Sequence, residues 1–177
     1  MILVCVALED ELPYTLPYQY SKIITGVGKI NATYTLTHAL SKVLGIQCVI
    51  NYGSAGGFPQ LQGKLCEVDY FVQRDMDCTA LGCDPYVTIG ETQSQIKTYN
   101  TTTPLYGCGT GDSFSEPTDD YPLVDMEGYA LAKVCKNFNI PFYSYKYVSD
   151  SGDPDDWEMN MHAGAEKFLK TLETFDI

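Results

Sequence analysis

The stretch from Leu123 to Asp153 constrains the fold of this 177-residue chain more than any other segment. From Met126 onward its apolar residues are spaced mostly at threes and fours, which predicts a helix. Pro141 ends that helix, because proline cannot continue a helix and biases the residue before it away from the helical conformation. Residues 142–148 are rich in aromatic and β-branched side chains and predict a buried strand. The stretch is therefore expected to hold a turn, a helix, a strand and a second, acidic turn.

Two carboxylates lie at the ends of these predicted elements. Glu127 stands at the start of the helix, and Asp150 follows Ser149 where the strand stops. Ligands bind at the carboxyl ends of strands in open α/β sheets, so the two acids are the first candidates for a site. Both positions also have a structural explanation, because an acid complements the helix dipole and aspartate stabilises turns. Spacing alone leaves both interpretations open.

The rest of the chain alternates between predicted strands and helices. Further strands are expected over residues 2–7, 22–25, 47–52, 67–72 and 104–108. Residues 83–103 are turn-rich and polar, with a weaker strand signal at 86–89. No repeat or linker interrupts the alternation, so we expect one domain over residues 1–177, of the α/β class with a central mixed or largely parallel sheet.

Two more helices are predicted, one near each end of the chain. Residues 30–44 form an amphipathic helix that Gly45 stops, and its expected buried stripe is Ile30, Tyr34, Leu40, Val43 and Leu44. Residues 154–175 form a terminal helix whose expected inward-facing residues are Trp157, Met161, Ala165, Phe168, Leu169 and Leu172.

Acidic or glycine-rich segments follow several predicted strands. Three acids, Glu9 to Glu11, come after the first strand, and a Gly-x-Gly at residues 26–28 precedes the first helix. That pair of glycines lets backbone approach a ligand, but it lacks the third glycine of a dinucleotide fingerprint. Residues 53–57, Gly-Ser-Ala-Gly-Gly, resemble a backbone cradle for an anion or a sugar, and a tight structural turn explains them equally well.

The net charge of the chain limits the classes of partner that it can bind. A net charge of −12 argues against nucleic acid and against an anionic membrane surface, since both attract basic patches. It leaves room for a small nucleoside, and fourteen tyrosines offer faces that stack on a base or pack a core edge. The apolar segment 1–7 is too short for a signal peptide or a membrane span.

Cysteine usage predicts a reducing compartment. The seven cysteines are odd in number, form no C-x-x-C pair and lie partly in apolar, strand-like runs. This pattern is typical of reduced thiols in a cytoplasmic protein rather than of a disulfide framework. With only two histidines, a zinc site has little support.

Taken in order, the motifs resemble the nucleoside phosphorylase superfamily, and most closely its 5′-methylthioadenosine/S-adenosylhomocysteine nucleosidases. The segments that carry the resemblance span nearly the whole chain: 7–11, 25–32, 49–57, 74–77, 109–114, 124–127 and 149–150. The resemblance implies a three-layer α/β/α sandwich with a central mixed sheet. It also implies hydrolysis of the N-glycosidic bond of purine nucleosides, such as methylthioadenosine or S-adenosylhomocysteine, with release of adenine and no metal or cofactor.

The resemblance assigns two catalytic residues. Glu11 would activate the attacking water, with Glu9 the weaker candidate, and Asp150 would protonate or hydrogen-bond purine N7, oriented by Ser149. Elementary chemistry agrees with this division. The bond breaks through an oxocarbenium-like sugar, the purine is a poor anionic leaving group that needs a general acid, and water is a weak nucleophile that needs a base.

The resemblance also assigns the residues that hold the substrate. Met126 would pack on the ribose and Glu127 would accept its hydroxyls, where it can also stabilise the developing positive charge. Phe114 would stack on the base, the backbone of Ser115 would read the base edge, and Ser54 would lie near the ribose or the water.

Two alternatives of the same fold stay open. A phosphorylase needs cations for phosphate, but near the glycine segments the sequence offers only Lys29, and Glu11 would repel phosphate, so hydrolysis is favoured. A non-catalytic nucleoside-binding module is the other alternative, and the retained acids argue against it. The resemblance further implies a homodimer, although Asp125 and Leu81 replace the family's usual glutamate and aromatic residue.

Overall fold

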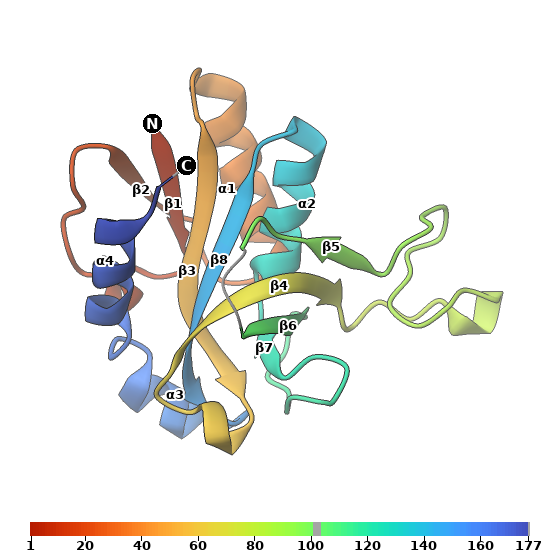
Figure 1. Cartoon of the computed structure of the whole chain (residues 1–177). Coiled ribbons are helices and arrows are strands. Elements are labelled where there is room, and N and C mark those ends of the chain that lie inside the picture. The colour runs from red at the N-terminus through yellow and green to blue at the C-terminus, as the bar shows by residue number, and fades with distance from the viewer. Residues whose placement is uncertain (101–103, 177) are drawn as a thin grey trace.

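A computed structural model describes residues 1–100 and 104–176 of the chain. An eight-stranded mixed sheet lies between α1 and α2 on one face and α3 and α4 on the other (Figure 1). The predicted three-layer α/β/α sandwich with a central mixed sheet is therefore confirmed.

The sheet places several strand ends along one edge. Its strands are β1 Ile2–Val6, β2 Tyr20–Ile24, β3 Cys48–Gly57, β4 Leu65–Gln73, β5 Gln95–Lys97, β6 Leu105–Thr110, β7 Leu123–Asp125 and β8 Phe142–Asp150. The order is β2-β1-β3-β7-β6-β4-β5, and β8 pairs with β3 and β4. Because β2, β1, β3 and β8 run parallel, their carboxyl ends meet at the same edge, where α/β proteins bind ligands.

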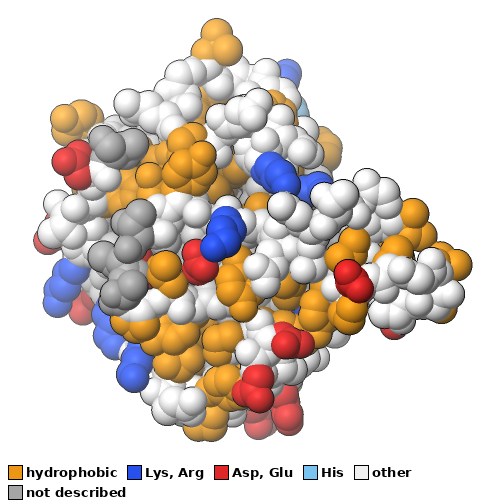
Figure 2. Space-filling model, turned by 45° about the vertical axis from the view of Figure 1, so that its right-hand side comes forward, with side chains coloured by type: hydrophobic (Ala, Val, Ile, Leu, Met, Phe, Trp, Pro, Cys, Tyr) orange, Lys and Arg blue, Asp and Glu red, His pale blue; other side chains and the backbone are white. Residues whose placement is uncertain are grey.

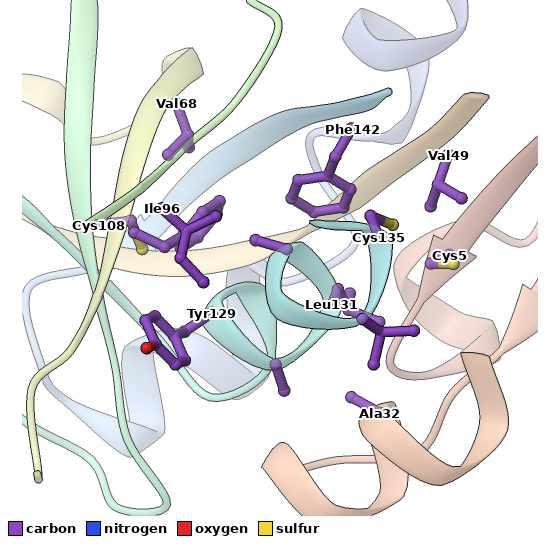
Figure 3. Packing of buried hydrophobic residues seen from close by; sticks show 14 of the residues in the cluster. Cys5, Ala32, Val49, Val68, Ile96, Cys108, Tyr129, Leu131, Cys135 and Phe142 are labelled. Atoms are coloured by element: carbon purple, nitrogen blue, oxygen red, sulfur yellow. The ribbon is translucent and has the colours of Figure 1, made fainter. Parts of the chain in front are cut away.

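The helices complete two hydrophobic cores. They are α1 Lys29–Lys42, α2 Gly128–Phe138, α3 Pro154–Asn160 and α4 Ala165–Thr174, with short 3₁₀ helices η1 Glu9–Glu11, η2 Pro59–Leu61 and η3 Thr79–Leu81. On one face, Leu131 and Cys135 of α2 pack among side chains such as Phe142 and Val49 of the sheet (Figure 3). On the other face, Phe168 of α4 is fully buried against the sheet.

The predicted buried stripe of α1 was wrong except at Leu40. The helix buries Ala32, Leu36 and Leu40, which are four residues apart and so lie on one side of it. Small Ala32 lets this side pack closely in the core beneath α1 and α2. The larger apolar residues face outward instead, with Ile30 81% and Tyr34 72% exposed.

Three other predictions about elements need correction. The single terminal helix is two helices, because the chain turns over residues 161–164 and Gly164 lies against Tyr147, where a Cβ would come within 2.3 Å of the ring. The weak strand at 86–89 is a turn, and the strand of that region is β5. The segment before α2 contains the short strand β7 rather than only a turn. Residues 101–103 of the predicted turn-rich segment lie outside the described residues.

Two further facts concern the described residues only. None of the helices there has the length and apolar composition that a membrane crossing requires. No three histidine, cysteine or acidic side chains in that part of the chain gather in a group that could hold a metal ion.

Candidate active site

One pocket collects nearly all of the residues that the sequence singled out. It opens at the carboxyl edge of the sheet, between the start of α2 and α3. Its lining includes seven of the eight expected site residues: Glu11, Ser54, Phe114, Ser115, Met126, Glu127 and Asp150. The eighth, Ser149, lies beside Asp150 and donates a hydrogen bond to it.

Glu11 is buried in this pocket, and the structure separates it clearly from Glu9. Its Oε2 accepts hydrogen bonds from the backbone N–H groups of Ala7 and Leu8, both at 3.1 Å. Its Oε1 accepts from the N–H of Ser54 at 2.8 Å and from the Ser54 hydroxyl at 2.7 Å. Glu9 points outward and pairs with a lysine, its side chain 61% exposed. Only Glu11 of the two is therefore placed to act on a bound ligand.

The glycine-rich segment 53–57 is not a turn but the second half of β3, with a register shift against β8 at Gly56. Its glycines make room for acids. A Cβ at Gly53 would lie 3.3 Å from Glu11 Oε1, and one at Gly56 would lie 3.1 Å from Asp150 Oδ1. Both distances are tight, so the strand lets the two carboxylates lie over its backbone.

Asp150 ends β8 and is almost fully buried. Its Oδ2 accepts a hydrogen bond from the Ser149 hydroxyl at 2.7 Å, and its Oδ1 accepts one from the N–H of Gly152 at 2.7 Å. The Ser149 hydroxyl also lies 3.3 Å from the carbonyl oxygen of Ala55 on the neighbouring strand. These contacts fix the carboxyl group in the pocket wall.

Glu127 is the N-cap residue of α2, but its side chain makes no capping hydrogen bond to that helix. Its Oε1 accepts a hydrogen bond from the N–H of Gly28 at 2.8 Å, across the pocket from α2. Burial and the negative charge of Asp125 raise the pKa of Glu127 to about 8, although Lys146 and the Gly28 N–H act in the opposite direction.

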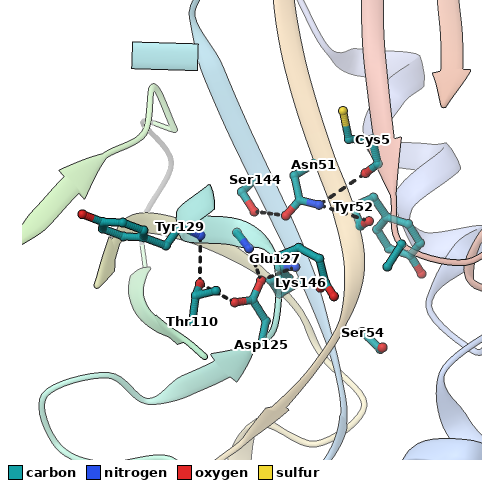
Figure 4. A network of polar contacts seen from close by, with 12 residues as sticks. Cys5, Asn51, Tyr52, Ser54, Thr110, Asp125, Glu127, Tyr129, Ser144 and Lys146 are labelled. Atoms are coloured by element: carbon teal, nitrogen blue, oxygen red, sulfur yellow. Dashed lines mark hydrogen bonds and ion pairs between the residues drawn. The ribbon is translucent and has the colours of Figure 1, made fainter. Parts of the chain in front are cut away.

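A buried ion pair supports the floor of the site and was not predicted. Lys146 Nζ of β8 lies 2.7 Å from Asp125 Oδ2, and each side chain is only 1% exposed (Figure 4). Asp125 also accepts hydrogen bonds from the Thr110 hydroxyl at 2.5 Å and the Gly128 N–H at 2.8 Å. Burial lowers the pKa of Lys146, but the Asp125 and Glu127 carboxylates outweigh it and raise that pKa well above its usual value. The available signal was a lysine in a strand that is otherwise rich in aromatic residues.

An aromatic pair forms another wall of the pocket. The rings of Phe114 and Trp157 meet edge to face, with centroids 6.0 Å apart. The Trp157 indole N–H donates a hydrogen bond to the Ser54 hydroxyl at 2.9 Å. The sequence had placed Trp157 only on the inward face of a long helix, so its link to Ser54 is a new finding.

The cations near the pocket differ from the expected ones. Lys29 pairs with Asp75 at 2.6 Å and lies 3.7 Å from Asp112, so its charge is neutralised. Arg74 begins the 74–77 motif, to which the sequence assigned no role in the site, and it lines the pocket. Its guanidinium donates to the carbonyl oxygen of Gly111 at 3.2 Å and to the carbonyl oxygen of Ser113. It therefore holds the segment that leads to Phe114.

This arrangement supplies the parts that hydrolysis of an N-glycosidic bond needs. Glu11 and Asp150 are two buried carboxyl groups on different strand ends of one pocket, and Glu127 and Met126 lie in the same lining. A base for water and an acid for a leaving group can thus act on one bound molecule. Phe114, 48% exposed, offers a ring face for a planar base.

Comparison with known proteins finds many relatives of one kind. The chain is 31% identical to the 5′-methylthioadenosine/S-adenosylhomocysteine nucleosidase of Marinomonas sp. over 80% of its own length and 74% of the relative's. It is 30% identical to that of Geobacillus thermodenitrificans over 83% of its length and 71% of the relative's, and 30% identical to that of Haemophilus influenzae over 73% and 66%. No family model matches the chain.

Solved structures agree on the fold. A Helicobacter pylori 5′-methylthioadenosine/S-adenosylhomocysteine nucleosidase superposes with a TM-score of 0.83 at 20% identity, covering 98% of this chain and 96% of that one. The futalosine hydrolase of the same organism superposes with a TM-score of 0.81 at 20% identity, covering 97% and 95%. At this level of identity the superpositions establish the architecture and leave the substrate open.

Proposed function

The chain belongs to the family of 5′-methylthioadenosine/S-adenosylhomocysteine nucleosidases, which are purine nucleoside N-glycosidases, and on that premise we propose that it hydrolyses 5′-thio-substituted adenosines and releases adenine. The observation that carries the proposal is the pocket shared by Glu11, Glu127 and Asp150.

Glu11 serves as the base that activates water. Four hydrogen bonds from two neighbouring segments hold its carboxylate, so it meets the water without first having to reorganise. Ser54, which donates two of these bonds, lies where it can also contact the water or the ribose.

Asp150 serves as the general acid at purine N7. Ser149 and the N–H of Gly152 hold its two oxygens, so the carboxyl group is fixed where it can pass a proton to a poor leaving group. The base stacks on Phe114, and the backbone of Ser115 reads its edge.

Glu127 and Met126 hold the sugar. The Glu127 carboxyl group accepts hydrogen bonds from the ribose hydroxyls, and its negative charge can stabilise the positive charge that develops on the sugar. Met126 packs an adaptable apolar side chain against the ribose.

Adenine release from 5′-methylthioadenosine is expected in phosphate-free buffer, at a rate that added phosphate leaves unchanged. The reason is electrostatic: Glu11 faces the position where phosphate would attack, Lys29 is already paired, and Arg74 binds backbone carbonyls. Chromatography of base and sugar products with and without phosphate measures this.

The sugar product provides the control for that experiment. Free 5-methylthioribose is expected in both buffers, and a sugar 1-phosphate formed only with phosphate present would identify a phosphorylase instead. S-adenosylhomocysteine and futalosine, assayed in parallel, compare the 5′-substituents. If base were released from futalosine but from neither 5′-thio nucleoside, the glycosidase activity would be supported and the proposed 5′-thio preference would be refuted.

We further propose a homodimer, and exposed apolar residues support it. Ile30 and Tyr34 of α1 are strongly exposed and line one surface groove. Leu81 and Ile89 are also exposed, in the segment between β4 and β5 that projects from the molecule (Figure 1), and apolar side chains are visible on this projection in the space-filling view (Figure 2, right). Exposed apolar patches mark protein interfaces.

A dimer is expected in sedimentation analysis at micromolar concentration, and Tyr34→Glu is expected to shift it towards monomer because it would bury a charge in the interface. Lys42→Glu, at an exposed position further along the same helix, is the matched control. A parent protein that sediments strictly as a fully active monomer would contradict the dimer.

We also propose that the protein acts in the cytoplasm, as the cysteine pattern of the sequence predicts. All seven cysteines are free and five of them are buried, which suits a reducing environment.

A further inference from the structure

Trp157 touches both halves of the candidate site. Its indole N–H donates to the Ser54 hydroxyl at 2.9 Å, and that hydroxyl donates to Glu11 Oε1 at 2.7 Å. Its ring meets the edge of Phe114 at a centroid distance of 6.0 Å. One side chain thus connects the carboxylate proposed to activate water with the ring proposed to stack on the base.

The helix that carries Trp157 packs on β8 and is also linked to the candidate site by hydrogen bonds. None of the seven residues of α3 is fully buried. Its start is held by Asp153, whose carboxylate accepts from the N–H of Asp155, and this turn follows directly on the Gly152 N–H that donates to Asp150. In the middle of α3, the Trp157 hydrogen bond fastens the helix to Ser54. The segment 152–157 is therefore linked to Asp150 through Gly152 and to Glu11 through Trp157 and Ser54.

We propose that Trp157 is a positioning residue for Glu11 that acts through Ser54 and at the same time closes the pocket against Phe114. This inference rests on the proposed hydrolysis.

The physical reason lies in the hydroxyl group of Ser54. A serine hydroxyl rotates and can donate in several directions. The indole N–H of Trp157 occupies one of its lone pairs, which leaves the proton directed at Glu11 Oε1. The indole donor also polarises the Ser54 hydroxyl and so strengthens the hydrogen bond that this hydroxyl donates to Glu11. Glu11 is thereby held in one orientation towards the water.

Two substitutions separate the hydrogen bond from the ring. Trp157→Phe removes the N–H but keeps an aromatic ring beside Phe114, so we expect kcat to fall about tenfold while KM changes less than about twofold. Trp157→Ala removes both, so KM is expected to rise as well. Met159→Ala, on the exposed side of the same helix, is the matched control and is expected to leave both constants unchanged.

A double-mutant cycle tests whether Trp157 acts through Ser54. In the Ser54→Ala background, Trp157→Phe is expected to cause no further loss of kcat, because the hydroxyl that it orients is absent. A full tenfold loss in that background, or an unchanged kcat in Trp157→Phe alone, would overturn the positioning role.

Fluorescence gives a readout that does not depend on turnover. Trp157 is the only tryptophan of the chain, so its emission reports on this pocket alone. Titration with adenine, followed in parallel by calorimetry, is expected to change the emission over the same concentration range as binding. Heat of binding without a change in emission would refute the closing of the pocket by Trp157. If the parent released no base, the proposed hydrolysis would fail while this titration still decided the placement of Trp157.

Discussion

Asp150→Asn is expected to lower the rate of base release by about 10²–10⁴-fold, the range that a lost general acid typically costs. Asparagine keeps the shape of the side chain and can still donate a hydrogen bond to purine N7, but it cannot transfer a proton. Nucleoside binding is therefore expected to persist while turnover is lost.

The hydrogen bonds around Asp150 can accommodate asparagine without loss of stability. One oxygen accepts from the Gly152 N–H, and an asparagine oxygen can do the same. The other oxygen accepts from the Ser149 hydroxyl, which can rotate and accept from the new amide instead. The variant thus leaves no buried group without a partner, and we expect its melting temperature to stay close to that of the parent.

Single-turnover adenine release measures the rate of base release, and thermal unfolding measures the melting temperature. Adenine titration followed by Trp157 emission measures whether binding persists. Asp119→Asn makes the same chemical change at an exposed position in the loop before β7 and should behave like the parent. Turnover by Asp150→Asn near the parental rate would remove the general-acid role from Asp150.

The order of the motifs was enough to find the lining of the pocket but not its support. Glu11 follows β1, Glu127 precedes α2 and Asp150 ends β8. Such positions can be recognised locally, because parallel strands bring their carboxyl ends together. Lys146 and Trp157 act through partners 21 and 103 positions away in the sequence, Asp125 and Ser54. A lysine in an aromatic-rich strand is visible in the sequence, but no local pattern records which residue it pairs with, so only the fold shows these two pairs.

The error in α1 has a similar origin. Periodicity identifies an apolar stripe, but a helix with two candidate stripes is turned by what it packs against. Small Ala32 and the two leucines that follow it at four-residue spacing fit the core, and the bulkier Ile30 and Tyr34 were left outside. The sequence alone could not show that the larger stripe faces a different surface, the one that we propose as a dimer interface.

Lys146→Met is expected to destabilise the fold by about 3–5 kcal/mol, because it removes one partner of a fully buried ion pair and leaves a charge without compensation. Asp125 would keep its hydrogen bonds from Thr110 and Gly128, but these neutral donors cannot replace a cation 2.7 Å away. Glu127 would also lose the positive charge that favours its ionised form.

The matched control is Lys97→Met, which breaks an ion pair with Asp69 at 3.8 Å in which the lysine is 73% exposed. Exposed pairs contribute about 0–1 kcal/mol, so urea unfolding of the two variants should differ several-fold in lost free energy. If the cost in Lys146→Met comes from an uncompensated carboxylate, adding Asp125→Asn should restore part of the stability, since the amide still accepts from Thr110 or Gly128. Two results would contradict this role of the ion pair in the floor of the pocket. One is a loss of less than about 1 kcal/mol of unfolding free energy in Lys146→Met. The other is a double variant whose loss equals the sum of the two single losses.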